Sequence, residues 1–390
     1  MTDNPQAAQP KLWLAACYFF YFSILGVLVP YLGLYLDFRG FDSGEIGTLM
    51  AILMATRVLA PNLWAWLADK TGWRVELIQL GSAAACFTFV SFYYPGGFLY
   101  TAASLALYTF FWNSILAQLE VVTLESLGNA THKYGKIRSW GSVGYIALSV
   151  AAGALIELFG PGAMLHIVLF LFAALMAVSL PLKRHKPSPV TQQTSSGFKP
   201  TASMIWFLLS SILLQMSMAP FYVFFVLYLE QLGYSATSAG FYVAIGVVAE
   251  IGIFLVASRL LGRFGVKSLL VVSLVFTTAR WLLLAHGGDS AVLLGISQIL
   301  HAFSFGLAHA ASIQYIHANF PKQHRSKGQA LYASLSFGLG GALGAYWIGQ
   351  VWQGGDGAQS AWHLAALWAG MAALTATMLQ SSKQKDHKTK

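Results

Sequence analysis

The fold of this chain is decided by a short polar loop between two long apolar segments, Leu67-Ala68-Asp69-Lys70-Thr71-Gly72-Trp73-Arg74. A loop of the same pattern returns in the second half of the chain, Leu260-Leu261-Gly262-Arg263-Phe264-Gly265-Val266-Lys267. A basic residue, a glycine and a second basic residue stand at equivalent positions in the two loops. A repeat of this kind between apolar segments is typical of a membrane protein built from two related halves.

Twelve apolar segments surround the two loops, and each is long enough for one membrane crossing of about 20 residues. They are residues 12–36, 43–66, 75–94, 98–127, 135–159 and 164–182, then 201–229, 236–257, 268–285, 291–318, 328–351 and 361–379. Charged side chains make up 9% of the 390 residues, whereas soluble domains have about 25%. This composition excludes a water-soluble fold and leaves no room for a large aqueous domain.

We therefore predict an all-α membrane protein with twelve transmembrane helices in two pseudo-symmetric six-helix bundles. The N-terminal bundle is residues 1–182, and a polar, proline-containing linker covers residues 183–200. The C-terminal bundle is residues 201–390 and ends in a short basic tail. Cys17 and Cys86 both lie in apolar runs, so we expect neither a disulfide framework nor a metal site.

The distribution of basic residues predicts the orientation in the membrane. Of the 23 Lys and Arg residues, Arg39 lies in a loop of one face, while Arg57 and Arg280 lie inside predicted helices. All the others, with Arg138 assigned to the loop edge of its helix, fall in the termini, the linker and the loops of the opposite face. Because cytoplasmic loops carry the excess of basic residues, we expect both termini in the cytoplasm and the chain in a bacterial inner membrane. The net charge of +9 thus reports topology, and no nucleic-acid partner is predicted.

The first loop resembles the signature loop of the major facilitator superfamily, with Ala65 in place of its first glycine and Trp73 in place of one basic residue. This resemblance implies a transporter fold. It also implies a conformational loop motif made by four residues, Asp69, Lys70, Gly72 and Arg74.

A narrower resemblance lies at the start of the fifth predicted helix, where residues 134–145 are similar to lactose permease, of the oligosaccharide/proton symporter group, and to the phenylpropionate permease family. Residues 233–236, 248–250, 279–281 and 300–309 continue the phenylpropionate permease-like pattern. Sugar-porter and drug-antiporter signatures are not evident in the sequence.

Ionisable residues inside predicted helices are candidates for function, because a charge at the centre of a bilayer costs about 2.5 to 3.5 kcal/mol even on a lenient scale. Arg138 and Tyr145 share one face of the fifth helix, while Asn113 and Glu120 are seven residues apart on the fourth. An arginine held by a carboxylate offers a forked donor to a substrate. The resemblance to lactose permease implies substrate-binding roles for Glu120, Arg138 and Tyr145; the alternative is that the charged pair only clamps two helices.

Two further residues are candidates for substrate binding. Arg57, in the middle of the second helix, is a second buried cation and suits an anionic substrate; the alternative is that it neutralises Glu120 or Glu125. Tyr222 follows Pro220 on the seventh predicted helix, where a proline kink can open a helix toward a cavity.

Four residues of the second half are candidates for proton coupling: Glu250, Arg280, His301 and His309. Burial disfavours the charged form of a carboxyl group, which suits Glu250 to carry a proton; the alternative is a static ion pair with Arg280. The two histidines lie on one side of the tenth helix, about 12 Å apart, and the alternative for each is a hydrogen-bonded helix contact. Lactose permease has a carboxylate one turn after the first histidine, but this chain has Ser304, so that proton path does not transfer directly.

These features together predict a monomeric secondary transporter that works by alternating access. We expect it to import a small organic solute with protons, with 3-phenylpropionate or a similar aromatic monocarboxylate as the substrate favoured by the family resemblance. A proton gradient supplies the energy, and no cofactor and no enzymatic activity are expected. The alternative is a proton-coupled sugar or nucleoside symporter; a membrane enzyme or a non-transporting receptor is more remote.

Overall fold

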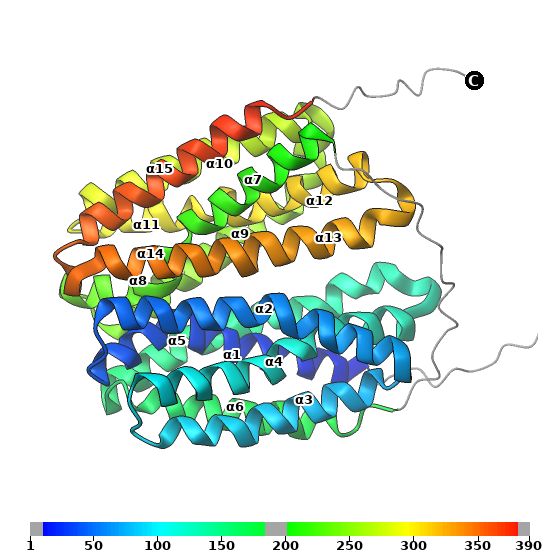
Figure 1. The fold of residues 1–390 in the computed structure, drawn as a ribbon, viewed down its shortest axis with the longest axis horizontal. Helices are drawn as coiled ribbons and strands as arrows, with labels where there is room; N and C mark the ends of the chain where they lie inside the picture. Colours follow the sequence, from blue (N-terminus) through cyan, green and yellow to red (C-terminus); the bar gives the residue numbers. More distant parts are fainter. Residues whose placement is uncertain (1–10, 184–200, 381–390) are drawn as a thin grey trace, which may run out of the picture. The chain divides into compact units, whose positions relative to one another are not determined.

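The computed structural model describes residues 11–183 and 201–380, and these residues are almost entirely helical (Figure 1). Six α-helices make up the described part of the first half: α1 (Lys11–Phe38), α2 (Ser43–Thr71), α3 (Arg74–Phe89), α4 (Phe98–Leu127), α5 (Tyr134–Phe159) and α6 (Ala163–Ser179). Two short 3-10 turns extend this set, η1 (Val90–Tyr93) after α3 and η2 (Gly128–Lys133) before α5.

The second half is divided into more helices because three of its predicted helices are interrupted. Its α-helices are α7 (Ala202–Ser217), α8 (Ala219–Gln231), α9 (Ala236–Phe264), α10 (Val266–Gly287), α11 (Ala291–Ile299), α12 (Ala308–Asn319), α13 (Arg325–Ala333), α14 (Gly341–Trp352) and α15 (Ala358–Thr377). The shorter pieces are the π-helical segments η3 (Ala302–Leu307) and η5 (Ser334–Gly340) and the 3-10 turns η4 (Lys322–His324) and η6 (Gln353–Gly355).

The predicted all-α membrane fold is confirmed, because helix covers each of the twelve apolar segments predicted above. Among the described residues, nine helices are long and apolar enough to cross a membrane, and α6 is a shorter apolar helix. The predicted linker lies outside the described residues except for Lys183, and so does the basic tail at residues 381–390. The break between α7 and α8 lies beside Pro220, where the sequence indicated a kink. The π-helical interruptions were not predicted, since apolar periodicity does not distinguish α from π turns.

The described residues divide into two compact units. The first unit contains α1 to α6 together with Pro220–Ala244 and Ala345–Ala358. Within it α1 packs on α5 and α6, and α3 packs between α4 and α6 (Figure 1). Aromatic side chains fill the space between α3, α4 and α6, where Phe89, Tyr108 and Phe172 are fully buried and in mutual ring contact.

Close backbone approaches join the segments of the first unit. A side chain at Gly47 of α2 would lie 2.6 Å from the carbonyl oxygen of Ala345 and 2.6 Å from the Cα atom of Gly349 on α14. The Tyr31 hydroxyl of α1 lies 2.7 Å from the carbonyl oxygen of Ser149 on α5 and 3.3 Å from that of Ala236. Residues 220–244 and 345–358 are therefore held against α1, α2 and α5 with little space for added atoms.

The glycines of the two repeated loops both have a positive φ, although their ψ values differ, 8° at Gly72 and 160° at Gly265. Gly72 ends α2 with a φ of 73°, and Gly265 stands between α9 and α10 with a φ of 78°. Left-handed φ values are available to glycine without strain. The sequence repeat therefore corresponds to a repeated sharp turn between consecutive helices.

The second unit contains residues 193–219, 245–344 and 359–390, of which those from 201 to 380 are described. Its two π-helical segments meet through Phe305 of η3 and Phe337 of η5, whose ring centroids are 6.0 Å apart. A π turn inserts one extra residue and redirects the side chains that follow, and such turns are frequent at functional sites. η3 thus determines where the side chains of α12 point, and η5 does the same for α14.

We predict that Gly47→Ala destabilises the protein, because the added methyl group would collide with the backbone of α14. Overpacking of this kind typically costs about 1–3 kcal/mol. The measurement is the melting temperature of the purified protein in detergent. The control is Gly370→Ala, since a side chain at Gly370 in α15 would meet nothing within 4 Å and alanine favours the helix by about 1 kcal/mol. A melting temperature of Gly47→Ala at or above that of Gly370→Ala would contradict this packing.

Candidate functional site

Glu120 on α4 and Arg138 on α5 lie near each other in the first unit, where the two side chains attract each other electrostatically. The Glu120 carboxylate also accepts a hydrogen bond from the Tyr134 hydroxyl. The Arg138 guanidinium lies over two rings of α1, 3.9 Å from the centroid of Phe22 and 5.6 Å from that of Tyr18. A carboxylate and aromatic faces therefore stabilise the charge of Arg138.

The second arginine of this unit, Arg57 on α2, has different surroundings. It is half-buried, and its electrostatic neighbours are three tyrosines: Tyr21 of α1, Tyr145 of α5 and Tyr222 of α8. Among residues 11–183 and 201–380, no carboxylate contacts this guanidinium. Tyrosine hydroxyls are neutral hydrogen-bonding groups, so they can orient Arg57 but leave its charge uncompensated.

Both carboxylates considered as counter-ions for Arg57 have other basic neighbours. Glu120 interacts with Arg138, and a Glu125 oxygen lies 3.9 Å from the Nε atom of Arg74. Removing a charge from water without a partner is costly. The interpretation of Arg57 as the counter-ion of Glu120 or Glu125 is therefore not favoured by these contacts, and a substrate-binding role for Arg57 stays a prediction.

Tyr21 joins the two arginines into one polar region, because it interacts electrostatically with Arg57, Glu120 and Arg138. The sequence analysis did not select Tyr21, Tyr18 or Tyr134. Tyr18 and Tyr21 are three residues apart on α1, which indicates a shared helix face, but aromatic residues at that spacing are equally common in a packed core. Only the neighbours of Tyr18 and Tyr21 in the structure distinguish a polar helix face from a packed core.

Asn113 is buried beside this region and bonds to another helix. Its Nδ2 atom donates to the Thr56 hydroxyl at 2.9 Å, and Thr56 in turn lies 3.1 Å from the Thr109 hydroxyl. Thr56 directly precedes Arg57, so Asn113 fixes the part of α2 that carries the arginine. A direct contact between Asn113 and a substrate stays a prediction.

In the second unit, three of the four predicted proton-coupling residues form one connected group. A terminal nitrogen of Arg280 lies 2.9 Å from the Nδ1 atom of His301, and the Nε2 atom of His301 lies 3.9 Å from a Glu250 oxygen. The other terminal nitrogen of Arg280 donates to Gln298 at 3.4 Å. Arg280 is fully buried, and its guanidinium lies 4.4 Å from the centroid of the Trp281 ring.

The hydrogen-bonding roles within this group follow from the chemistry of arginine. A guanidinium can only donate, so the Nδ1 atom of His301 accepts and carries no proton. The ring proton is then on Nε2, which faces Glu250. Because the imidazole can gain a second proton only by losing its bond from Arg280, Glu250 is the member of this group best able to accept one.

His309, the fourth predicted residue, lies two turns farther along the same helix. Phe305 stands between the two histidines, with ring centroids 5.9 Å from His301 and 5.8 Å from His309, and its plane is nearly parallel to both imidazoles. The Nδ1 atom of His309 lies 3.4 Å from the Tyr332 hydroxyl. Since a phenyl ring transfers no proton, the described contacts do not link the histidines into one relay, and a role for His309 stays a prediction.

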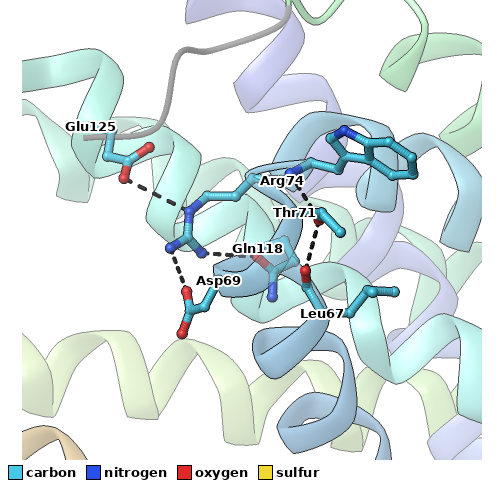
Figure 2. A network of polar contacts seen from close by, with 7 residues as sticks. Leu67, Asp69, Thr71, Arg74, Gln118 and Glu125 are labelled. Atoms are coloured by element: carbon cyan, nitrogen blue, oxygen red, sulfur yellow. Dashed lines mark hydrogen bonds and ion pairs between the residues drawn. The ribbon is translucent and has the colours of Figure 1, made fainter. Parts of the chain in front are cut away.

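The loop motif is built around Arg74, as Figure 2 shows. One terminal nitrogen of Arg74 lies 2.8 Å from an Asp69 oxygen, and the other donates to the Gln118 side chain at 3.2 Å. Glu125 lies beyond its Nε atom. These contacts join the loop to the C-terminal part of α4. Lys70 lies over the Trp66 ring, 5.1 Å from its centroid.

Comparisons with known proteins agree with this architecture. The sequence model of the MFS_1 like family matches residues 11–364 of this chain. A probable 3-phenylpropionic acid transporter of Escherichia coli (strain K12) is 28% identical over 358 residues, which cover 88% of this chain and 92% of that protein. A maltose permease of Geobacillus stearothermophilus is 27% identical over 339 residues and 86% of each chain. The crystal structure of nucleoside transporter NupG superposes with a TM-score of 0.82 at 20% identity, covering 95% of this chain and 98% of that one.

We predict that Arg74→Ala destabilises the protein more than Lys70→Ala does. The arginine side chain is 15% exposed, and its loss leaves the buried Gln118 oxygen without its donor, an effect worth about 1.5–3 kcal/mol for a charged hydrogen bond. Lys70→Ala removes only an exposed contact between the lysine ammonium and the Trp66 ring, worth about 0.5–1 kcal/mol. Thermal unfolding in detergent measures both. Equal losses in the two variants would show that the Arg74 contacts do not stabilise the fold.

Proposed function

Because this chain belongs to the MFS_1 like family, we propose that it is a proton-coupled symporter for a small organic anion. The chain is a multi-pass membrane transporter of the major facilitator type. The proposed substrate is an aromatic monocarboxylate such as 3-phenylpropionate, and the proposed direction is import across a bacterial inner membrane with both termini in the cytoplasm. We further propose that it acts as a monomer, with the proton gradient as its energy source and no cofactor.

The observation that carries this proposal is the uncompensated charge of Arg57. A neutral sugar or nucleoside would leave that charge without a counter-ion, whereas a carboxylate can accept two parallel hydrogen bonds from a guanidinium. Arg138 is less suited to the task, since Glu120 already attracts it. The similarity to a probable 3-phenylpropionic acid transporter supports the same substrate class.

The tyrosines around Arg57 support an aromatic substrate. Their hydroxyls can orient the guanidinium, and their rings offer apolar faces next to the charge. A substrate with a carboxylate at one end and a phenyl ring at the other would match both features. In this proposal Arg57 binds the carboxylate, and Tyr21, Tyr145 and Tyr222 contact the remainder of the molecule.

The group of Glu250, His301 and Arg280 is proposed to carry the proton. A proton on Glu250 cancels the negative charge that faces the Nε2 proton of His301, which weakens that contact and frees α9 to change its position. One proton and one monocarboxylate carry opposite charges, so the loaded transporter gains no net charge from its two ligands. The cycle is then electroneutral and is driven by the pH difference alone.

A proton-coupled sugar or nucleoside symporter is the second candidate. It is favoured by the similarity to a maltose permease and by the pairing of Glu120 with Arg138 that the resemblance to lactose permease implies. Uptake of labelled aromatic acids, sugars and nucleosides into reconstituted vesicles under a pH gradient separates the candidates. Accumulation of a sugar or nucleoside, with no accumulation of any acid, would refute the anion proposal.

We predict that Arg57→Gln weakens binding of 3-phenylpropionate by at least about 30-fold, since losing one partner of a buried ion pair costs about 2 kcal/mol or more. Arg57→Lys should retain part of the affinity because it keeps the charge but loses the fork. Arg39→Gln is the control, since Arg39, in the turn after α1, donates to the Tyr35 hydroxyl of α1 and to the Gly96 carbonyl oxygen. Equilibrium binding to purified protein provides the measurement, and unchanged affinity in Arg57→Gln would remove this residue from the substrate site.

We predict that Glu250→Gln abolishes accumulation against a gradient but leaves exchange of substrate across the membrane, because the amide mimics the protonated carboxyl group. Wild-type uptake should also be independent of membrane potential at a fixed pH gradient. Asp289→Asn, a change at an exposed turn after α10, should leave both activities intact. Full accumulation by Glu250→Gln would exclude it from the proton path, and potential-driven uptake would refute electroneutral coupling.

A further inference from the structure

A pair of exposed histidines joins the end of α10 to the start of α15 in the second unit. The Nε2 atoms of His286 and His363 are 2.9 Å apart, and their ring centroids are 4.8 Å apart with an angle of 50° between the planes. Gln359 lies one turn before His363 on α15, and its Nε2 atom is 3.3 Å from the Nδ1 atom of His286. These residues have no part in the transport sites described above.

The packing beneath the pair holds its two helices in place. The Trp281 ring of α10 and the Trp362 ring of α15 are both fully buried and stack with centroids 5.6 Å apart and an angle of 21°. The Trp281 indole nitrogen also donates to the Ser217 hydroxyl of α7 at 3.3 Å. The imidazoles therefore converge from helices whose separation is already set by large buried side chains.

Two converging Nε2 atoms are suited to a divalent ion that prefers nitrogen ligands. Zinc binds histidine nitrogens at about 2.0–2.1 Å, which places two nitrogens of a tetrahedral site about 3.3 Å apart. The observed separation of 2.9 Å needs to widen by only a few tenths of an ångström, which a small rotation of exposed side chains can supply.

We propose that His286 and His363 form a binding site for zinc, or for a similar late transition-metal ion, with water at the remaining coordination positions. Among the residues that the structure describes, no third His, Cys, Asp or Glu joins the pair. Two protein ligands with open positions make an exchangeable site rather than a permanent structural one. Bound zinc would connect α10 to α15.

Gln359 acts as a positioning residue in this site. Coordination through Nε2 requires that His286 carry its proton on Nδ1, so the proton shared between the imidazoles moves to that atom and none is released. When the side-chain amide of Gln359 flips, its oxygen accepts a hydrogen bond from the Nδ1 proton of His286. Such partners orient the histidine ligand, and removing one typically weakens binding about 10–100-fold.

The location fits an ion supplied from outside the cell. Lys267, in the second basic loop, begins α10, and His286 lies at the opposite end of this helix. If that loop is cytoplasmic, as the basic residues predict, the histidine pair faces the outer side. Metal binding itself depends on neither this orientation nor the proposed transport activity, because it can be measured on purified protein.

The test is calorimetric titration of zinc into detergent-purified protein that carries no polyhistidine tag, together with melting temperatures with and without zinc. We expect one zinc ion per chain and a higher melting temperature in its presence, as mass action requires for an ion that binds only the folded state. Magnesium, which prefers oxygen ligands, should have neither effect. Cobalt substitution should give the visible absorption of a nitrogen-bound ion.

His286→Ala and His363→Ala should each abolish zinc binding and the zinc-dependent rise in melting temperature, while Gln359→Ala should weaken binding about 10-fold or more at unchanged stoichiometry. The matched control is His166→Ala, because His166 is an exposed histidine at the start of α6 whose ring contacts Tyr93. If either alanine variant fails to fold, His286→Gln and His363→Gln replace it. No zinc binding in the wild type, or equal binding in His286→Ala and His166→Ala, would overturn the proposal.

Discussion

The cost of placing a charge within a bilayer governs the organisation of this protein. Most of its basic residues avoid the cost by lying near helix ends, in loops or in the terminal and linker segments. The few that lie farther inside the helices must find a counter-charge, an aromatic face or a ligand. Arg138 has Glu120 and the Phe22 ring, and Arg280 has His301 and the Trp281 ring. The contacts of Arg138 with Glu120 and Phe22, and of Arg280 with His301, each join two helices, so neutralising a charge also helps to assemble the bundle.

Arg57 differs from Arg138 and Arg280 in its neighbours, and the proposed function rests on this difference. Its described neighbours are tyrosines, which contribute hydrogen-bonding groups but no negative charge. A transporter that must bind and release an anion in every cycle needs a cation whose partner is removable, whereas a permanent ion pair would compete with the substrate. The contrast between Arg57 and Arg138 within one polar region is thus the contrast between a proposed binding residue and a stabilised one.

The glycine turns and the helix ranges were predictable because they depend on local chemistry. A polar loop between apolar segments must turn sharply, and Gly72 and Gly265 adopt the left-handed φ values that allow it. The π turns of η3 and η5 were not predictable. They depend on packing against neighbouring helices, as in the contact of Phe305 with Phe337, and apolar periodicity carries no signal for it.

The sequence by itself determined that this chain crosses a membrane many times, that its halves are related and which ionisable residues are buried, because hydropathy and charge act residue by residue. Only the tertiary structure decided which partner each buried charge has. It assigned Glu125 to Arg74, inserted His301 between Arg280 and Glu250 and surrounded Arg57 with tyrosines from three helices. The physical reason is that a charge interacts with whatever lies within a few ångströms, and those neighbours come from helices far apart along the chain.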